Sequence, residues 1–357
     1  MPDIETKSEQ KDEDRIMELN FGRVEGLPPE EQQWLQELKY IYDYHRSANR
    51  KKRRYYNGKV TLNEVNLGIA LPAGLGKLEI GCAWGAKTVD VLAGRSMFDG
   101  FVTENGTKSE DMDQIMKRNH LIAEYNKAVK EELKYGCTFA AVSGEKDDAR
   151  VRFYSPHCAA ASWNAHEGRI RCGFAFEDAR RDESDVTWSP EHVNFYTDTD
   201  IWELDRIGGA WYATQNPHGF GEPLMVALIW DATNDKPFGQ SRLKEPVRRL
   251  IQGYVRTVAN ATIGLEFATS PQKYLLGVSD EQYDMLIDNK FKQYVGSILY
   301  STNNPETGEK PNFGQLSQGN IEPHVQMLRM LATQYSAATG LAVTDVGVIN
   351  DANPTSS

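Results

Sequence analysis

The segment Pro72–Gly81 contains glycines and a lysine, but not at the spacing of a phosphate-binding loop. A Walker loop, GxxxxGK followed by Ser or Thr, cradles phosphates with backbone amides and holds Mg²⁺ through the hydroxyl. Before Gly76-Lys77, Leu71 occupies the position of the first glycine, and Leu78 replaces the hydroxyl residue. The loop lacks the groups that bind Mg-ATP, and ATPase activity is therefore not predicted.

Two segments contain histidines that could serve as metal ligands. His166-Glu167 begins a string similar to HExxH, which needs two histidine ligands one helical turn apart. Ile170 stands where the second histidine would be, and the segment has the pattern of a turn and a strand. His157-Cys158 has no partner at metal spacing, so a core or turn position is favoured. We expect no metal and no other cofactor.

Hydroxyl and carboxyl side chains also give little indication of catalysis. Ser96, Ser143 and Ser241 each lack the GxSxG elbow that exposes a nucleophile. Asp198 and Asp200 could share one face of a strand and bind a metal, but a solvated strand edge is the commoner reason for this spacing. The chain is therefore not predicted to be an enzyme.

A basic run is the strongest local charge feature. Six of its nine residues are basic: Arg46, Arg50, Lys51, Lys52, Arg53 and Arg54. Tyrosines that could stack on bases flank it on both sides: Tyr40, Tyr42, Tyr44, Tyr55 and Tyr56. A solvated helix end, a phosphate contact and a docking patch for an acidic partner all remain open, and that partner could be the acidic arm of a neighbouring subunit.

The composition describes a folded protein of more than one sub-domain. The 357 residues are 40% hydrophobic, which is enough to bury a core, and no apolar run is long enough to span a membrane. The N-terminus lacks an apolar signal region, which predicts a cytosolic origin. Four scattered cysteines favour reduced thiols over disulfides: Cys82, Cys137, Cys158 and Cys172.

The net charge of −11 argues against a protein that coats DNA, because such binding requires Lys and Arg at the phosphates. It does not argue against a conduit. A channel lining that held DNA tightly would resist its movement, so an acidic balance suits a channel.

The N-terminal two thirds predict an α+β fold. Residues 1–31 carry ten acidic and four basic side chains and are predicted to form a flexible acidic arm. Helices are predicted over 32–49 and 109–134, with a loop or short strand over 66–76. Short strands separated by turns are predicted in the block 136–230, over 138–142, 151–154, 170–176, 193–196, 210–214 and 224–230.

The C-terminal third is predicted to be helical again. Residues 241–268 and 319–340 have the apolar spacing of long amphipathic helices, with Asn320 able to cap the second and Gly340 to end it. The insert 269–318 includes a predicted short helix over 280–295. Spacing alone favours an ordinary helical hairpin over helices that pack side by side in a ring.

The end of the chain carries a resemblance to a known family. The second helix ends in Thr339-Gly340-Leu341, and a short loop leads to NPTS at 353–356. Further back, HGFGEPLMVALIWDATNDKPFGQSRLKEPVRRLI precedes a long helix and PQKYLLGVS. In order and spacing these segments resemble the portal proteins of tailed bacteriophages, the head-to-tail connectors of long-tailed phages. The resemblance is clear from Gly219 to Ser279 and at the C-terminus, and fainter before about Gly136.

Two features depart from the family pattern. Ala342 stands where a proline is common after TGL, and the sequence stops at Ser357, where NPTS would open another long helix. The resemblance therefore implies a portal-like chain without the C-terminal long helix and crown, whose ring could be incomplete.

The resemblance also implies a division of the chain into portal domains. Residues 32–240 would be the wing, 241–268 and 319–340 the two stem helices, 269–318 an α/β clip, and 341–357 a truncated channel (tunnel) loop. Copies would form a ring of twelve at one capsid vertex, as the conduit for DNA packaging and ejection.

The partners that the resemblance implies are double-stranded DNA bound without sequence preference, the terminase large subunit, head-completion and tail-connector proteins, and capsid or scaffold proteins. No membrane is implied. The protein would be assembled in the bacterial host cytoplasm and reside in the virion. The candidate channel or inter-subunit residues are Arg248, Arg249, Arg256, Arg329, Val346, Gly347, Asn350, Asp351 and Asn353. The alternatives are a capsid-associated adaptor of a phage or prophage without a channel, and a nucleic-acid-processing enzyme.

Overall fold

The computed structural model describes residues 16–17, 19–60, 80–102, 110–144, 148–177, 179–181, 187–269, 273–276, 308, 312–315 and 320–347. Backbone contacts divide the chain into two compact units. The first comprises Met1–Lys59 and Ala83–Arg248, and the second comprises Val60–Cys82 and Arg249–Ser357. The described parts of each unit are considered separately.

The first unit is built on two facing sheets. The larger has six strands in the order β2-β11-β10-β9-β6-β5, namely Val24–Glu25, Ala210–Pro217, Asp200–Ile207, His192–Tyr196, Arg169–Ala175 and Ala159–Asn164. The smaller has the order β12-β3-β4, namely Met225–Ile229, Cys137–Ser143 and Arg150–Tyr154. A third sheet has the order β1-β8-β7, namely Ile16–Met17, Thr187–Pro190 and Ala179–Arg181.

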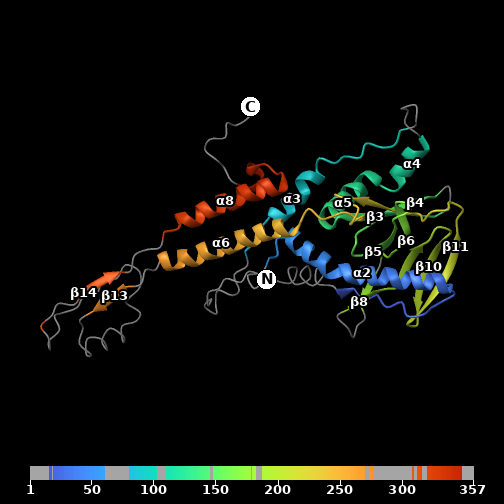
Figure 1. Ribbon diagram of the computed structural model, residues 1–357, viewed down its shortest axis with the longest axis horizontal. Helices are drawn as coiled ribbons and strands as arrows, with labels where there is room; N and C mark the ends of the chain where they lie inside the picture. The colour runs from blue at the N-terminus through green and yellow to red at the C-terminus, as the bar shows by residue number, and fades with distance from the viewer. Residues whose placement is uncertain are drawn as a thin grey trace, which may run out of the picture. The chain divides into compact units, whose positions relative to one another are not determined.

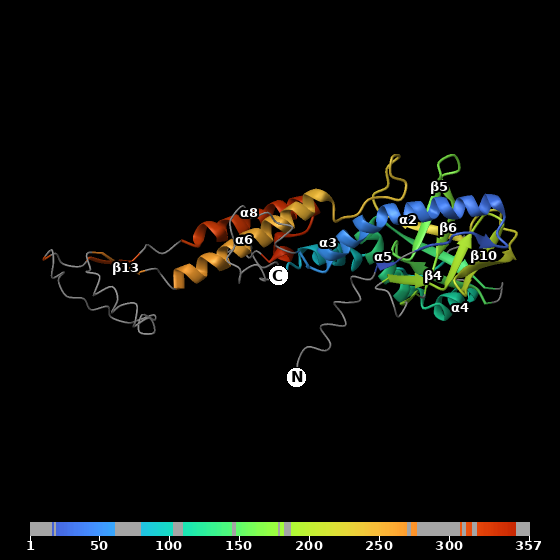
Figure 2. The same cartoon turned by 90° about the horizontal axis from the view of Figure 1, so that it is seen from below.

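Helices cover the outer faces of the two sheets, which gives four layers (Figures 1 and 2). The 28-residue helix α2 (Pro29–Tyr56) packs on the larger sheet, with Leu35, Leu38 and Tyr42 in one core cluster with Phe174. A second cluster fills the space between the sheets. Helix α5 (Leu121–Tyr135) packs on the outer face of the smaller sheet. The order is therefore α2, larger sheet, smaller sheet, α5.

The predicted helix over 109–134 is two helices. Helix α4 (Glu110–Arg118) ends before Asn119, and α5 begins after His120, whose φ of 50° lies in the left-handed region. Such a conformation interrupts an α-helix. The apolar stripe continues through the break, which is why spacing alone did not reveal it. Helix α3 (Trp84–Ala93) was not predicted.

The N-terminal arm was predicted to extend too far. Leu19, Phe21 and Val24 are buried in the α2 core cluster, and the helix predicted over 32–49 begins at Pro29 and continues to Tyr56. The high charge content of residues 1–31 concealed these core positions. The predicted 66–76 segment, the short helix over 280–295 and most of the arm lie outside the described residues.

The strand predictions are confirmed in position, and within the same block the structure adds β5, β7, β8 and β10. Strand β6 does not keep one alternation of buried faces along its whole length. A β-bulge at Arg171 of β6, opposite the Ser162/Trp163 step of β5, shifts the register, so that Cys172 and Phe174 face α2 whereas Ile170 joins the cluster between the sheets. A bulge adds one residue and reverses the faces beyond it.

The second unit contains two antiparallel helices that lie side by side (Figures 1 and 2). They are α6 (Glu245–Thr269), whose first residues count with the first unit, and α8 (Glu322–Thr339). A Cβ at Gly253 would lie 3.2 Å from Leu331 Cδ2, so the glycine permits the close approach of α8. Strands β13 (Lys273–Leu276) and β14 (Asn312–Gln315) pair antiparallel.

The predicted C-terminal end of α8 is found, whereas the N-cap position is occupied by Ile321 and not by Asn320. The Asn320 side chain accepts a hydrogen bond from the Glu322 amide at 2.9 Å, and Gly340 caps the C-terminus with a φ of 70°. Beyond it, Val343–Val346 forms a 3-10 helix, η4. None of the helices that the structure describes is long and apolar enough to cross a membrane.

Candidate functional site: the junction of α2, α5 and α6

The basic run lies inside α2, one side of which is buried. Lys51 is exposed, but Asn49 and Tyr55 are buried beside it. The Lys52 ammonium donates a hydrogen bond of 2.8 Å to the carbonyl oxygen of Tyr135, the last residue of α5. Burial lowers the pKa of Lys52 to about 8. Lys52 therefore joins two helices of one subunit and is not a solvated charge at a helix end.

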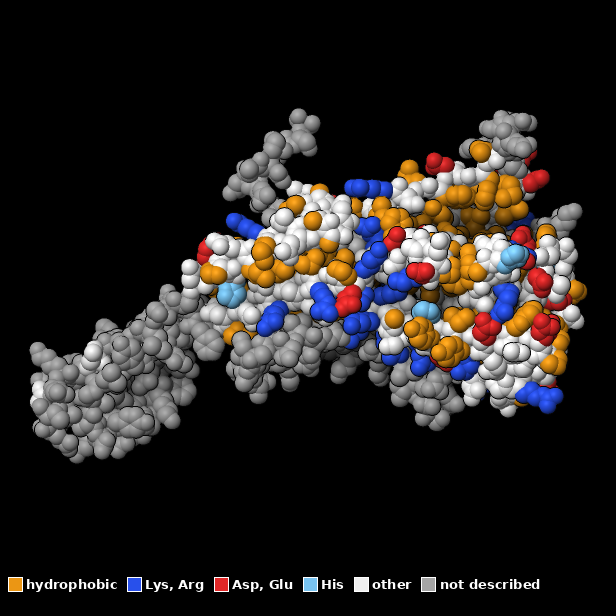
Figure 3. Space-filling view, in the orientation of Figure 1, with side chains coloured by type: hydrophobic (Ala, Val, Ile, Leu, Met, Phe, Trp, Pro, Cys, Tyr) orange, Lys and Arg blue, Asp and Glu red, His pale blue; other side chains and the backbone are white. Residues whose placement is uncertain are grey.

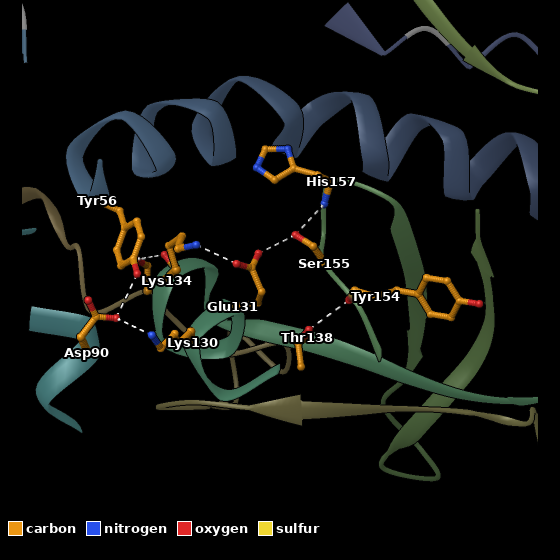
Figure 4. A network of polar contacts seen from close by, with 10 residues as sticks. Tyr56, Asp90, Lys130, Glu131, Lys134, Thr138, Tyr154, Ser155 and His157 are labelled. Carbon is orange, nitrogen blue, oxygen red and sulfur yellow. Dashed lines mark hydrogen bonds and ion pairs between the residues drawn. The ribbon is translucent and has the colours of Figure 1, made fainter. Parts of the chain in front are cut away.

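A chain of polar contacts continues from the end of α2 (Figure 4). The Tyr56 hydroxyl donates to Asp90 on α3 at 2.9 Å, and Lys130 of α5 lies 3.4 Å from the same carboxylate. The Lys134 ammonium lies 2.7 Å from Glu131 and 4.1 Å from the centroid of the Tyr56 ring. These contacts bind the C-terminal turn of α2 to α3 and α5.

The same network reaches the turn between β4 and β5 (Figure 4). Ser155 donates to Glu131 at 2.8 Å, and the Tyr42 hydroxyl donates to the backbone oxygen of His157 at 2.8 Å. The His157 ring packs edge-on against Tyr135 at 4.9 Å. Burial, and then the neighbouring cations, lower the pKa of His157 to about 3. His157 is therefore a neutral packed ring at physiological pH, as expected for a turn position.

The segment that leads into α6 is fixed to this junction. Ser241 donates to the Lys134 backbone oxygen at 2.5 Å and accepts from the Leu243 amide at 3.0 Å. The Arg242 backbone amide donates a hydrogen bond to the Leu133 backbone oxygen at 2.9 Å. The Arg242 guanidinium donates to the Thr88 backbone oxygen, also at 2.9 Å. The start of α6 is thus held by α3 and α5. Short-range sequence patterns contain no signal for these long-range contacts.

The candidate arginines have different environments. Arg248 donates to the Leu243 backbone oxygen at 2.5 Å, and its guanidinium lies 5.9 Å from the centroid of the Tyr55 ring, so its contacts are within the first unit. Arg249 and Arg256 are exposed on α6, seven residues apart and therefore on one side of the helix. Arg329 is exposed on α8.

The candidate loop residues are only partly described. Val346 is buried at the end of η4, and Gly347 follows it with a φ of 86°, a conformation that favours glycine. The loop residues Asn350, Asp351 and Asn353 lie outside the described residues, as does most of the Pro72–Gly81 loop.

A hollow of about 460 Å³ lies beside β4 and includes Arg118, Arg150 and Arg152 in its wall. Asp148 lies 3.2 Å from both Arg118 and Arg150, and Arg152 pairs with Glu177. The arginine charges are therefore balanced by carboxylates, and the hollow is not a concentrated anion site.

The remaining aspartate, histidine and cysteine candidates do not form a catalytic or metal site in the described part of the chain. Asp200 is buried and accepts from Gln215 at 2.9 Å, whereas Asp198 is exposed. His166 lies in an exposed turn. Within the described part of the chain, no group of three or more His, Cys, Asp or Glu residues could hold a metal ion. The four cysteines are present as free thiols.

A match to a known family covers most of the first unit. Residues 35–229, more than half of the chain, match the family described as "Phage portal protein, SPP1 Gp6-like". The chain belongs to this portal family. The match confirms the resemblance that was first based on the C-terminal segments, and it extends into the region where that resemblance was faint. The family assigns the chain a structural role as a portal or connector, and its fold is α+β, as predicted.

Other comparisons are more distant. No curated protein matches the portal chain. Among solved structures, a chain from "Neck of empty GTA particle computed with C6 symmetry" is 12% identical, with a TM-score of 0.47 over 84% of this chain and 78% of that one. A chain from "Neck of native GTA particle computed with C12 symmetry" is also 12% identical, with a TM-score of 0.43 over 76% and 68%. The family assignment depends on the sequence match alone.

Proposed function

We propose that this chain assembles into a homo-oligomeric ring of twelve subunits at one capsid vertex and forms the conduit for DNA packaging and ejection. The observation that carries the proposal is the portal match over residues 35–229. In this assignment the first unit is the wing, α6 and α8 are the stem helices, residues 269–318 are the clip, and the segment from Leu341 onward is the channel loop.

The helix pair of the second unit supports this assignment. Apolar side chains on both helices are exposed in the single subunit, among them Leu265, Val325, Met327 and Met330. Exposed apolar side chains on long helices suit packing against neighbouring copies. Arg249, Arg256 and Arg329 would then face phosphates or adjacent subunits, with weak contacts that carry no sequence information.

The ring would act as a structural, non-enzymatic component of the virion, assembled in the host cytoplasm. It would bind the terminase large subunit during packaging, and head-completion, tail-connector, capsid or scaffold proteins at other surfaces. Passage of double-stranded DNA requires no base-specific contact, since phosphate contacts supply affinity without sequence readout.

Electron microscopy of the purified chain tests the proposal. We expect closed rings with a central pore, and native mass measurement should give the mass of twelve subunits. Particles without a pore would favour a capsid-associated adaptor. Turnover that depends on ATP or a metal would contradict the non-enzymatic role.

A further inference from the structure

Helix α2 presents two tyrosines to solvent on the side that faces away from the larger sheet. Leu38 and Tyr42 point into the core, whereas Tyr40 and Tyr44 are 71% and 70% exposed. Their rings stack with centroids 6.4 Å apart. An exposed stacked pair on a rigid helix offers a large contact surface and loses little conformational entropy when it is bound.

The opposite outer layer carries a second apolar surface, the outer patch. It consists of Met97, Phe101, Val102 and Ile122, which are 77%, 40%, 69% and 55% exposed. Phe98 packs against both Phe101 and Tyr125, at 5.2 and 5.4 Å, and Ser96 lies 3.1 Å from the Tyr125 hydroxyl. These contacts fix the segment on α5, one turn from Ile122.

The two surfaces lie on opposite sides of the same unit. Helices α2 and α5 are the first and last of its four layers and meet at their C-terminal ends, where Lys52 contacts Tyr135. Both views show α2 and α4 on opposite sides of the sheets (Figures 1 and 2). Figure 3 shows hydrophobic side chains gathered over α2 and again over α4. Two different patches on opposite faces are what head-to-tail association needs, because an isologous contact uses one patch twice.

Four of these six side chains, Tyr40, Tyr44, Met97 and Phe101, are of the types that are enriched in the cores of protein interfaces. The tyrosine rings can cover aliphatic and aromatic side chains while their hydroxyls remain in contact with water. We propose that Tyr40 and Tyr44 of one copy bind the outer patch of the next copy, as the contact between adjacent wings. This inference rests on the proposed ring.

Directional cross-linking tests the contact. Tyr44→Cys and Ile122→Cys would be made separately and in one chain, and treated with a short bismaleimide. The unaltered chain is the background control, since its cysteines are buried or half-buried. The double variant should give a ladder up to the ring size. Each single variant should stay uncross-linked, and a mixture of the two should stop at dimers. Thermal unfolding of each variant checks that the exposed substitutions leave the fold intact.

Three cross-linking results would overturn the inference. A ladder absent from a double variant that forms normal rings in the microscope would remove this contact and leave the portal function standing. Dimers from a single variant would show that the surface is isologous. Absence of both rings and ladder would contradict the contact and the proposed function together.

A second measurement is the yield of rings. The double substitution Tyr40→Arg with Tyr44→Arg should lower this yield at least tenfold. The control, Gln33→Arg with Ser47→Arg on the same exposed side of α2, should not lower it.

Discussion

The side-chain amide of Asn119 takes the place of a neighbouring strand beside Val151. Its oxygen accepts the Val151 backbone amide at 3.0 Å, and its nitrogen donates to the Ala149 backbone oxygen at 3.0 Å. Strand β4 is the edge of the smaller sheet, and edge strands present unpaired backbone groups. Asn119, which lies beside His120 in the break between α4 and α5, therefore also covers part of this edge.

Asn119→Ala should destabilise the first unit by about 1–3 kcal/mol, because it leaves backbone groups of β4 without their partner. Denaturant unfolding measures this change. Asn126→Ala, at an exposed position of α5, is the matched control and should change stability by less than about 0.5 kcal/mol. Equal effects of the two substitutions would contradict the role of Asn119.

His157 predicts a loss of stability in acid. Its pKa is about 3 in the folded chain and 6.5 as the ordinary value. Between these values the unfolded state binds one more proton, so the contribution of His157 is present above pH 6.5 and is lost as the pH falls toward 3. The slope should reach about 1.4 kcal/mol per pH unit.

The measurement is unfolding free energy between pH 7 and pH 4 for the unaltered chain and His157→Gln. The variant should show a shallower pH dependence. His166→Gln, in an exposed turn, is the control and should retain the original slope. Identical slopes in all three proteins would show that His157 does not supply this proton.

Gly253 predicts a size conflict within the second unit. Val at this position would bring methyl groups toward Leu331, and overpacking costs about 1–3 kcal/mol. Gly264 lies on the same helix, and a Cβ added there would meet no neighbouring atom within 4 Å. Gly264→Val therefore changes the helix propensity in the same way as Gly253→Val but creates no contact with α8. Hydrogen exchange of α8 should increase only in Gly253→Val, and Leu331→Ala should reverse part of the increase. Equal exchange in both valine variants would contradict the close approach.

Under the proposed function, the exposed arginines of α6 predict a defect in packaging. Arg249→Glu with Arg256→Glu should lower the DNA packaged per particle by about an order of magnitude, as loss of several phosphate contacts does. Lys87→Glu with Lys117→Glu, exposed in the first unit, is the control with the same change in net charge. Normal rings and normal packaging in the arginine variant would refute the assignment of these residues to the channel or to a subunit contact.

Local patterns predicted the elements better than their limits or their partners. The helices α6 and α8 follow from helical spacing over single segments, and strand patterns over single segments indicated β3, β4, β6, β9, β11 and β12. The break at His120 and the bulge at Arg171 were not indicated, because each interrupts a continuous apolar pattern with a backbone irregularity. Likewise, the basic run correctly indicated a helix, but the number of its charges did not reveal that Lys52 is half-buried and hydrogen-bonded to the Tyr135 backbone oxygen.

The sequence by itself determined the α+β class, the long amphipathic helices, the absence of complete phosphate-loop and zinc motifs, and the resemblance to portal proteins. These depend on the order and spacing of residues along the chain. The tertiary structure decided that Ser241, Lys134, Glu131 and Ser155 form one connected junction, and that the tyrosines of α2 and the outer patch lie on opposite layers. Contacts between residues 100 or more positions apart depend on how the layers stack, and local periodicity does not encode that stacking.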